Sequence, residues 1–98
     1  MDIRKELTEN RRDVAVSGRL DTTTAPELDA ALREALPGVK ELVLDFSALD
    51  YISSAGLRVL LSAQKTMSKQ GSMKLTGVNE SVMEVFEITG FSGILTIE

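Results

Sequence analysis

Hydrophobic and polar residues along the chain group into short stretches of strand type and longer stretches of helix type. The first two stretches are predicted strands over residues 3–7 and 13–18, separated by the turn-like residues 9–11. So short a connection joins antiparallel strands, because a parallel crossover needs about a dozen residues. Val14 and Val16 share one face of the second strand, and we expect that face to meet the core.

Three later segments also have strand character. Residues 42–44 form a continuous apolar run within the segment 41–46, which is typical of a central strand covered on both faces. Residues 73–76 alternate between apolar and polar side chains and predict a fourth strand. Residues 95–97 are the candidate for a last strand.

Apolar residues at helical spacing predict three helices, over residues 24–36, over residues 54–70, and from Ser81 to the glycine at 90. The first and the third have the capping-box pattern of a hydroxyl residue followed three positions later by a glutamate, in Thr24 with Glu27 and in Ser81 with Glu84. All three helices stop at glycine-containing positions, which are Pro37–Gly38, Gly71 and Gly90.

The resulting order is β-β-α-β-α-β-α with an optional last strand, which is typical of an α/β fold. Right-handed crossovers then place the helices mainly on one face of a small mixed sheet that begins with an antiparallel hairpin. With 98 residues, 43% hydrophobic and 27% charged, the composition is that of a globular chain rather than a disordered one. We therefore expect a single domain over residues 1–98.

Composition excludes several function classes. The chain has no cysteine and no histidine, which removes disulfides, thiolate chemistry, cysteine-bound zinc and a Ser-His-Asp hydrolase. Its net charge of −4 has the wrong sign for a protein that binds duplex nucleic acid. No apolar run reaches the ~20 residues of a membrane helix, and the charged start is unlike an export signal. We expect a cytoplasmic protein that has no metal site and no direct contact with nucleic acid or membrane.

Candidate chemistry gathers in two segments that each leave a strand and enter a helix. One is residues 45–57, and the other is residues 18–25. If the two strands lie parallel in one sheet, the two segments share the edge formed by the carboxyl ends of the strands, where ligands and partners usually bind. Ser53 and Ser54 fall at the start of the longest helix, where free N–H groups and the helix dipole favour an anion by about 0.3–1 kcal/mol. On the residues alone, a serine at this position is more often a plain helix cap.

The segment over residues 18–25 also carries Asp21, which precedes the expected helix cap by three positions. The cap does not need this aspartate, so a role in function is the stronger interpretation of Asp21 than of the threonines beside it. In the other segment, Asp45, Ser47 and Asp50 have an alternative interpretation as ordinary turn formers.

The motifs resemble those of a known family. They are GRLDTTTA at residues 18–25, DFSALDYISSAGL at residues 45–57, and the tail from Leu75-Thr76-Gly77 to Ile88-Thr89-Gly90-Phe91. Together they resemble the STAS family, and within it the small bacterial anti-sigma factor antagonists. In that family the serine two positions before the helix glycine is phosphorylated by the anti-sigma factor, which is a serine kinase. The resemblance therefore implies phosphorylation of Ser54, with Gly56 as the glycine, and kinase recognition through Asp21.

The sequence departs from the family pattern at the loop itself. Antagonists commonly carry Asp-Ser-Ser-Gly or Asp-Ser-Thr-Gly there, whereas this chain has Ser53 in place of the aspartate and Ala55 in place of the second hydroxyl residue. Ser53 is consequently a rival phosphorylation site to Ser54. The departure leaves open a STAS module that binds a protein, a small ligand or a nucleotide without being phosphorylated.

The resemblance also implies how the protein works. The unphosphorylated form binds an anti-sigma factor and frees a sigma factor, phosphorylation releases it, and a serine phosphatase resets it. The chain contains no GxxxxGK[ST] motif, so ATP and Mg²⁺ belong to the partner kinase and the chain needs no cofactor. The residues expected to contact the kinase or another partner are Asp21, Thr22, Thr23, Tyr51, Ser53, Ala55, Gly56 and Arg58.

Two further classes compete with this interpretation. An enzyme with Ser54 as nucleophile would lack a histidine base, and no Ser-x-x-Lys motif stands at that position. A receiver-like domain phosphorylated on Asp45 would have its acceptor at a strand end, but the first strand lacks the acidic pair that holds Mg²⁺. We therefore expect a binding module that is not an enzyme.

Overall fold

One mixed sheet forms the centre of the molecule. The computed structural model describes all residues from 1 to 98. In chain order its elements are β1 (Asp2–Thr8), β2 (Arg11–Leu20), α1 (Ala25–Ala35), β3 (Glu41–Ile52), α2 (Ser54–Gln70), β4 (Ser72–Thr76), α3 (Glu80–Thr89) and the 3₁₀ helix η1 (Phe91–Gly93). The strand order is β1-β2-β3-β4, antiparallel between β1 and β2 and parallel at the other two pairings. The predicted hairpin and mixed α/β fold are confirmed.

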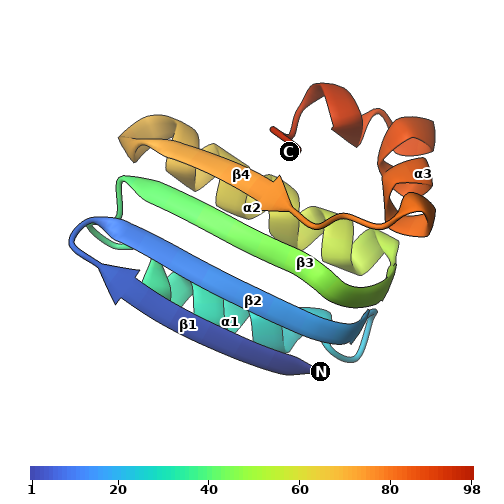
Figure 1. Cartoon of the computed structure of the whole chain (residues 1–98), viewed down its shortest axis with the longest axis horizontal. Coiled ribbons are helices and arrows are strands. Elements are labelled where there is room, and N and C mark those ends of the chain that lie inside the picture. Colours follow the sequence, from blue (N-terminus) through green and yellow to red (C-terminus); the bar gives the residue numbers. More distant parts are fainter.

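The helices lie mainly on one side of this sheet. Figure 1 shows α1 and α2 side by side behind the strands, with α3 beyond the end of β4. Apolar side chains between these helices and the sheet form one core cluster of 23 buried residues, including Val14 and Val16 as expected. None of the α-helices combines the length and hydropathy that a membrane-spanning segment requires.

The central strand β3 is longer than the sequence predicts, because it runs on to Ile52 instead of ending near Phe46. Its second half pairs with β2, whose register shifts twice to keep the two strands together. Asp45 therefore lies in the middle of β3 and not at a strand end, so the expected position of a receiver-type acceptor is wrong. Because β3 ends at Ile52 and α2 begins at Ser54, the turn between them consists of Ser53 alone.

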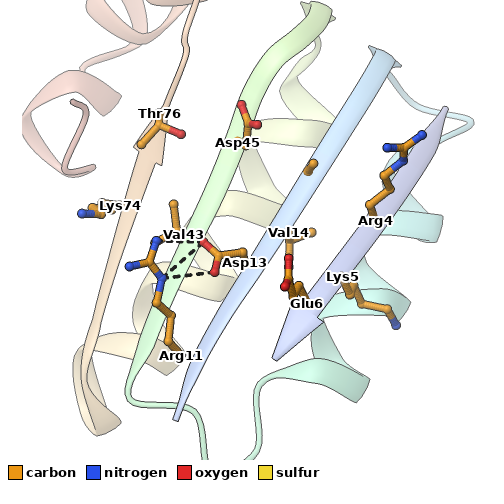
Figure 2. A pocket seen from close by; sticks show the side chains of 11 residues that line it. Arg4, Lys5, Glu6, Arg11, Asp13, Val14, Val43, Asp45, Lys74 and Thr76 are labelled. Atoms are coloured by element: carbon orange, nitrogen blue, oxygen red, sulfur yellow. Dashed lines mark hydrogen bonds and ion pairs between the residues drawn. The ribbon is translucent and has the colours of Figure 1, made fainter. Parts of the chain in front are cut away.

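Only one face of β3 is covered by helices, so the predicted cover on both faces is wrong. Val43 points to the open face, yet it is only 5% exposed. Long charged side chains from β2 and β4, among them Arg11, Asp13 and Lys74, surround it and line a hollow of about 640 Å³ (Figure 2). The aliphatic parts of such side chains shield an apolar floor while their charges stay in water.

Both predicted capping boxes are wrong, because neither the Thr24 nor the Ser81 hydroxyl caps its helix. Thr24 is the residue before α1, but its side chain makes no cap hydrogen bond and donates to the Arg19 carbonyl at 2.7 Å. The cap of α3 is Asn79, whose side-chain oxygen accepts from Val82 N at 2.8 Å. Ser81 therefore lies inside the helix.

The end of α2 and the chain terminus lie against neighbouring strands. Gly71 ends α2 as predicted, and a Cβ there would lie 1.8 Å from the Lys40 carbonyl oxygen, so only glycine fits. The candidate last strand is reduced to one bridge between Leu75 and Ile97. There, Leu75 N donates to the Thr96 carbonyl and Glu98 N donates to the Leu75 carbonyl, both at 2.9 Å.

Candidate functional site

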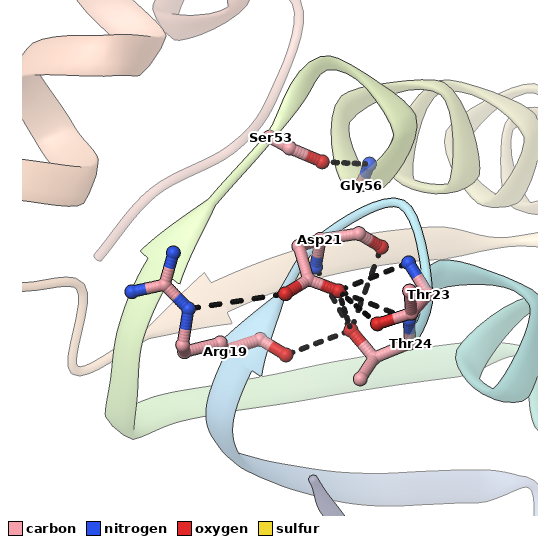
Figure 3. Close-up of polar contacts among 6 residues, drawn as sticks. All are labelled: Arg19, Asp21, Thr23, Thr24, Ser53 and Gly56. Carbon is pink, nitrogen blue, oxygen red and sulfur yellow. Dashed lines mark hydrogen bonds and ion pairs between the residues drawn. The ribbon is translucent and has the colours of Figure 1, made fainter.

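The candidate site is formed by two turns at the carboxyl ends of neighbouring parallel strands. Leu20, the last residue of β2, pairs with Ile52, the last residue of β3. Ser53 N then donates to the Leu20 carbonyl oxygen at 2.9 Å, which fixes the β3–α2 turn against the β2–α1 turn. The prediction that the two segments share one edge of the sheet is confirmed, and Figure 3 shows them together.

Asp21 organises the β2–α1 turn. One of its carboxylate oxygens accepts from Thr23 N at 3.0 Å, from Thr23 Oγ1 at 2.7 Å and from Thr24 N at 3.1 Å. Hydrogen bonds stabilise the ionised carboxylate, so the Thr23 hydroxyl first and the Thr24 amide next lower the pKa of Asp21 below its ordinary value. Thr24 Oγ1 accepts from Asp21 N at 2.8 Å and closes the turn.

Arg19 and Tyr51 add a basic and aromatic surface beside this turn. They pair across β2 and β3, and the guanidinium carbon of Arg19 lies 4.3 Å from the centre of the Tyr51 ring. Arg19 Nε is also 3.8 Å from the second carboxylate oxygen of Asp21. Tyr51 is 40% exposed, so this stacked pair is accessible to a partner. The sequence reasoning selected Tyr51 but missed Arg19.

The two serines at the start of α2 have different environments. Ser53 is the N-cap, with φ −101° and ψ 176°, and its Oγ accepts from Gly56 N at 3.5 Å. Ser54 is the first residue of the helix and is exposed, and its hydroxyl makes no hydrogen bond within the chain. The cap explanation considered for a serine at this helix start therefore applies to Ser53 alone.

Gly56 allows α2 to approach the ends of both strands. It is buried, and a Cβ built on it would lie 2.7 Å from Leu20 Cγ and 2.8 Å from Ile52 Cγ1. Real Cβ atoms do not approach other carbons so closely, so any larger residue would push the helix or the strands aside. The glycine thus sets how closely the start of α2 lies to the Asp21 turn.

Three more of the predicted contact residues meet in a shallow groove. Thr22 from the first turn, and Ala55 and Arg58 from α2, line a hollow of about 400 Å³ between the starts of α1 and α2. Thr22 and Arg58 are exposed, and Ala55 is partly buried. The structure therefore brings all eight predicted contact residues to one end of the molecule.

The family follows from a comparison over almost the whole chain. A family model described as "Mlab, STAS domain" matches residues 3–96. The chain belongs to the STAS domain family. It is 40% identical to BtrV of Bordetella bronchiseptica over 84 residues, which span 84% of this chain and 72% of BtrV. It is 35% identical to the anti-sigma-B factor antagonist of Listeria monocytogenes over 98 residues, spanning 96% of this chain and 84% of that protein.

Solved structures agree with this placement. The fold matches the Bacillus cell fate determinant SpoIIAA in its phosphorylated form with a TM-score of 0.76, covering 99% of this chain and 91% of that one. The sequence identity in this match is 18%, so the similarity concerns the fold. The predicted STAS-like architecture is confirmed.

Proposed function

We propose that this protein is an anti-sigma factor antagonist that binds an anti-sigma factor in its unphosphorylated form and is released when Ser54 is phosphorylated. Family membership and the antagonist from Listeria monocytogenes support the first part. The observation that carries the second part is the free, exposed hydroxyl of Ser54 at the first position of α2. A kinase can reach this oxygen without breaking any bond of the fold.

The different surroundings of the two serines favour Ser54 over Ser53 as the phosphate acceptor. Ser53 is partly buried and its oxygen is engaged in the helix cap, so a kinase acting on it would have to open the first turn of α2. Ser54 follows one residue later, is exposed and takes no part in that cap. The lack of an aspartate at position 53 does not affect this argument, because Ser53 supplies the cap instead.

The transfer itself needs a partner. The Ser54 oxygen attacks the γ-phosphorus of ATP, its proton is lost to a base, and ADP leaves. We assign ATP, Mg²⁺ and the base to the anti-sigma factor as a serine kinase. A serine phosphatase restores the hydroxyl by hydrolysis, in which water attacks the phosphorus and inorganic phosphate leaves. Such partners act in the cytoplasm, which supports a cytoplasmic location for this protein.

Two effects then compete at the phosphorylated serine. The group carries about −1.5 to −2 charges at pH 7, and the positive end of the α2 dipole stabilises it by about 0.3–1 kcal/mol. Asp21 lies in the adjacent turn and Asp50 is exposed near the end of β3. Like charges brought together and desolvated in an interface cost several kcal/mol, so release of the partner outweighs the dipole effect.

The docking surface consists of the eight residues predicted from the sequence, with Arg19 added. Asp21 holds the first turn in shape, and Gly56 sets the distance between the turns. The Arg19–Tyr51 pair, Thr22 and Arg58 offer exposed side chains for direct contact. Ser54 stands between Ser53 and Ala55 of this surface at the start of α2, so a charge added there falls inside the interface.

The decisive experiment combines phosphosite mapping with binding. The chain is incubated with the serine-kinase anti-sigma factor of its own organism and ATP, and intact mass and peptide mapping locate the phosphate. We expect one phosphate on Ser54, none in Ser54→Ala, and at least about tenfold weaker anti-sigma factor binding by Ser54→Asp, since 1.4 kcal/mol is tenfold. Ser72→Asp, at the opposite end of the sheet, is the control and should bind normally. Phosphate on Ser53, or full binding by Ser54→Asp, would refute the proposed switch.

A further inference from the structure

The two edges of the sheet differ in a way that the proposed function does not explain. The β4 edge is covered, because the chain terminus forms hydrogen bonds with Leu75 on its outer side. The β1 edge has no such cover, since β1 pairs only with β2 and six of its seven residues are exposed. Figure 1 shows β1 as the outermost strand on this side. An uncovered edge is a template for pairing with another strand.

The backbone of β1 can form such a pairing along its full length. Thr8 and Arg11 close the turn of the hairpin and pair with each other, so in an antiparallel ladder the residues that bond to β2 alternate from Thr8 backwards. Ile3, Lys5 and Leu7 then direct their N–H and C=O groups away from β2, into solvent. These three residues carry the unpaired donors and acceptors of the edge.

The side chains of β1 are complementary to a second copy of the same strand. We propose that two copies of this chain associate through an antiparallel β1–β1 pairing centred on Lys5. This is the register in which the seven residues of β1 overlap completely, since Asp2 then lies opposite Thr8. In the same register Arg4 of each copy lies opposite Glu6 of the other.

Favourable side-chain pairs would form on both faces of this strand pairing. Arg4 and Glu6 pair with Ala15 and Asp13 of β2, which places them on the open face of the sheet, where Figure 2 shows both side chains. Two unlike-charge pairs would form there. On the helix face, Ile3 of each copy would meet Leu7 of the other, and the 53% exposure of Leu7 would be reduced. Both kinds of cross-strand pair are favourable.

Neighbouring registers lack this match. A two-fold axis perpendicular to the sheet always places one residue opposite itself, so the registers change in steps of two residues. Centring on Arg4 opposes two arginines and sets Asp2 against Glu6, both pairs of like charge. Centring on Glu6 opposes two glutamates and leaves Arg4 opposite Thr8. The charges of β1 thus discourage other pairings and favour one, which is how edge charges confer specificity.

The centre of the pairing contains one unfavourable contact, because Lys5 lies opposite Lys5 of the second copy. Like charges directly opposite each other destabilise a strand pair, so we expect reversible, concentration-dependent association. The product would be an eight-stranded sheet with the helices mainly on one side. Because the two β1 strands run in opposite directions, the two Ser54 turns would lie at opposite ends of that sheet, both open to partners.

Charge reversal tests the pairing in solution. Sedimentation velocity over a concentration series should show a monomer–dimer equilibrium. Arg4→Glu turns both unlike-charge pairs into like-charge pairs and should raise the dissociation constant about tenfold. Arg4→Glu combined with Glu6→Arg restores the unlike pairs and should recover the dimer. Lys5→Thr removes the central repulsion and should strengthen it. Lys65→Glu, an exposed substitution on α2, should have no effect.

Amide hydrogen exchange gives a second measurement on the same samples. Protection of Ile3, Lys5 and Leu7 should rise with concentration, whereas Arg4 and Glu6, already bonded to β2, should change little. Circular dichroism checks that each variant is folded. A chain that stays monomeric even as Lys5→Thr overturns the proposal. So does a dimer that Arg4→Glu leaves intact, or one that the double variant fails to recover, because either result places the contact elsewhere.

Discussion

The two turns of the candidate site are alike in position and opposite in construction. Each leaves a parallel strand and enters a helix, and the two strands are neighbours. In the β2–α1 turn, one carboxylate oxygen of Asp21 accepts hydrogen bonds from both Thr23 and Thr24, and Thr24 closes the loop. In the β3–α2 turn, a single cap of 3.5 Å involves Ser53, and Ser54 has no bond from its hydroxyl.

This difference separates two tasks that a reversible switch requires. The β2–α1 turn keeps its shape because its polar groups are satisfied within the loop, so it can serve as a fixed reference for a partner. The β3–α2 turn leaves a nucleophilic oxygen exposed, so a kinase can modify it without unfolding the site. Gly56 connects the two by letting α2 contact Leu20. Substitutions in each turn should therefore have different and predictable effects.

Gly56→Ala should have the largest effect, because it changes the contact between the turns. Its new Cβ would need the space of Leu20 Cγ and Ile52 Cγ1, both buried, and overpacking of this kind costs about 1–3 kcal/mol. Urea unfolding should show a lower midpoint at unchanged slope. Gly93→Ala is the control, since its Cβ would meet no atom within 4 Å. Equal stability losses in the two variants would contradict the close approach.

Removing each serine hydroxyl in turn should have a smaller effect, and it should differ between the two. Ser53→Ala removes the cap of α2 and should cost about 0.5–1 kcal/mol, the lower part of the range for N-caps, because the bond is long. Ser54→Ala removes an oxygen without partners and should leave the free energy of unfolding within about 0.5 kcal/mol. Urea unfolding of both variants measures the contrast. Equal losses would mean that Ser54 shares the cap.

The order of elements and the hairpin could be predicted because they depend on local patterns and on the handedness of crossovers. The full length of β3 could not, since residues 47–52 lack a strand pattern and are held by long-range pairing with a bulged β2. The capping boxes failed for a related reason. The Thr24 hydroxyl donates to the Arg19 carbonyl instead of capping α1, and α3 is capped by Asn79, two residues before Ser81. Tertiary partners decided between locally reasonable alternatives.

The position of the site could also be predicted, because parallel strands bring their carboxyl ends to one edge. Which serine caps the helix could not, since it depends on β3 ending at Ile52. The stacking of Arg19 on Tyr51 was missed because it depends on the second register shift between β2 and β3. A cation and an aromatic residue at the ends of adjacent strands are the sequence signal that could have suggested it.

The smallest expected effect concerns the titration of Asp21. Thr23→Val removes the hydroxyl that contributes most to the low pKa of this carboxyl, so the pKa should rise toward its ordinary value while the Thr24 amide still lowers it in part. Carbon-detected NMR titration of the carboxyl group measures this directly. Thr22→Val is the matched control, because Thr22 is exposed and the hydrogen bonds to the Asp21 carboxylate come from Thr23 and Thr24.

The same substitution fixes the sign of a stability change with pH. A carboxyl whose pKa is lower in the folded chain than in the unfolded chain stabilises the fold above the unfolded pKa, and this contribution disappears as pH falls through the folded value. Thr23→Val reduces the difference between the folded and the unfolded pKa of Asp21. As pH drops below the unfolded pKa of about 3.9, the free energy of unfolding should therefore fall less steeply than in the original chain. If the free energy of unfolding fell in the same way at acid pH in both chains, the Thr23 hydroxyl would not stabilise the ionised form of Asp21. The fixed character of the β2–α1 turn would then rest on its backbone bonds alone.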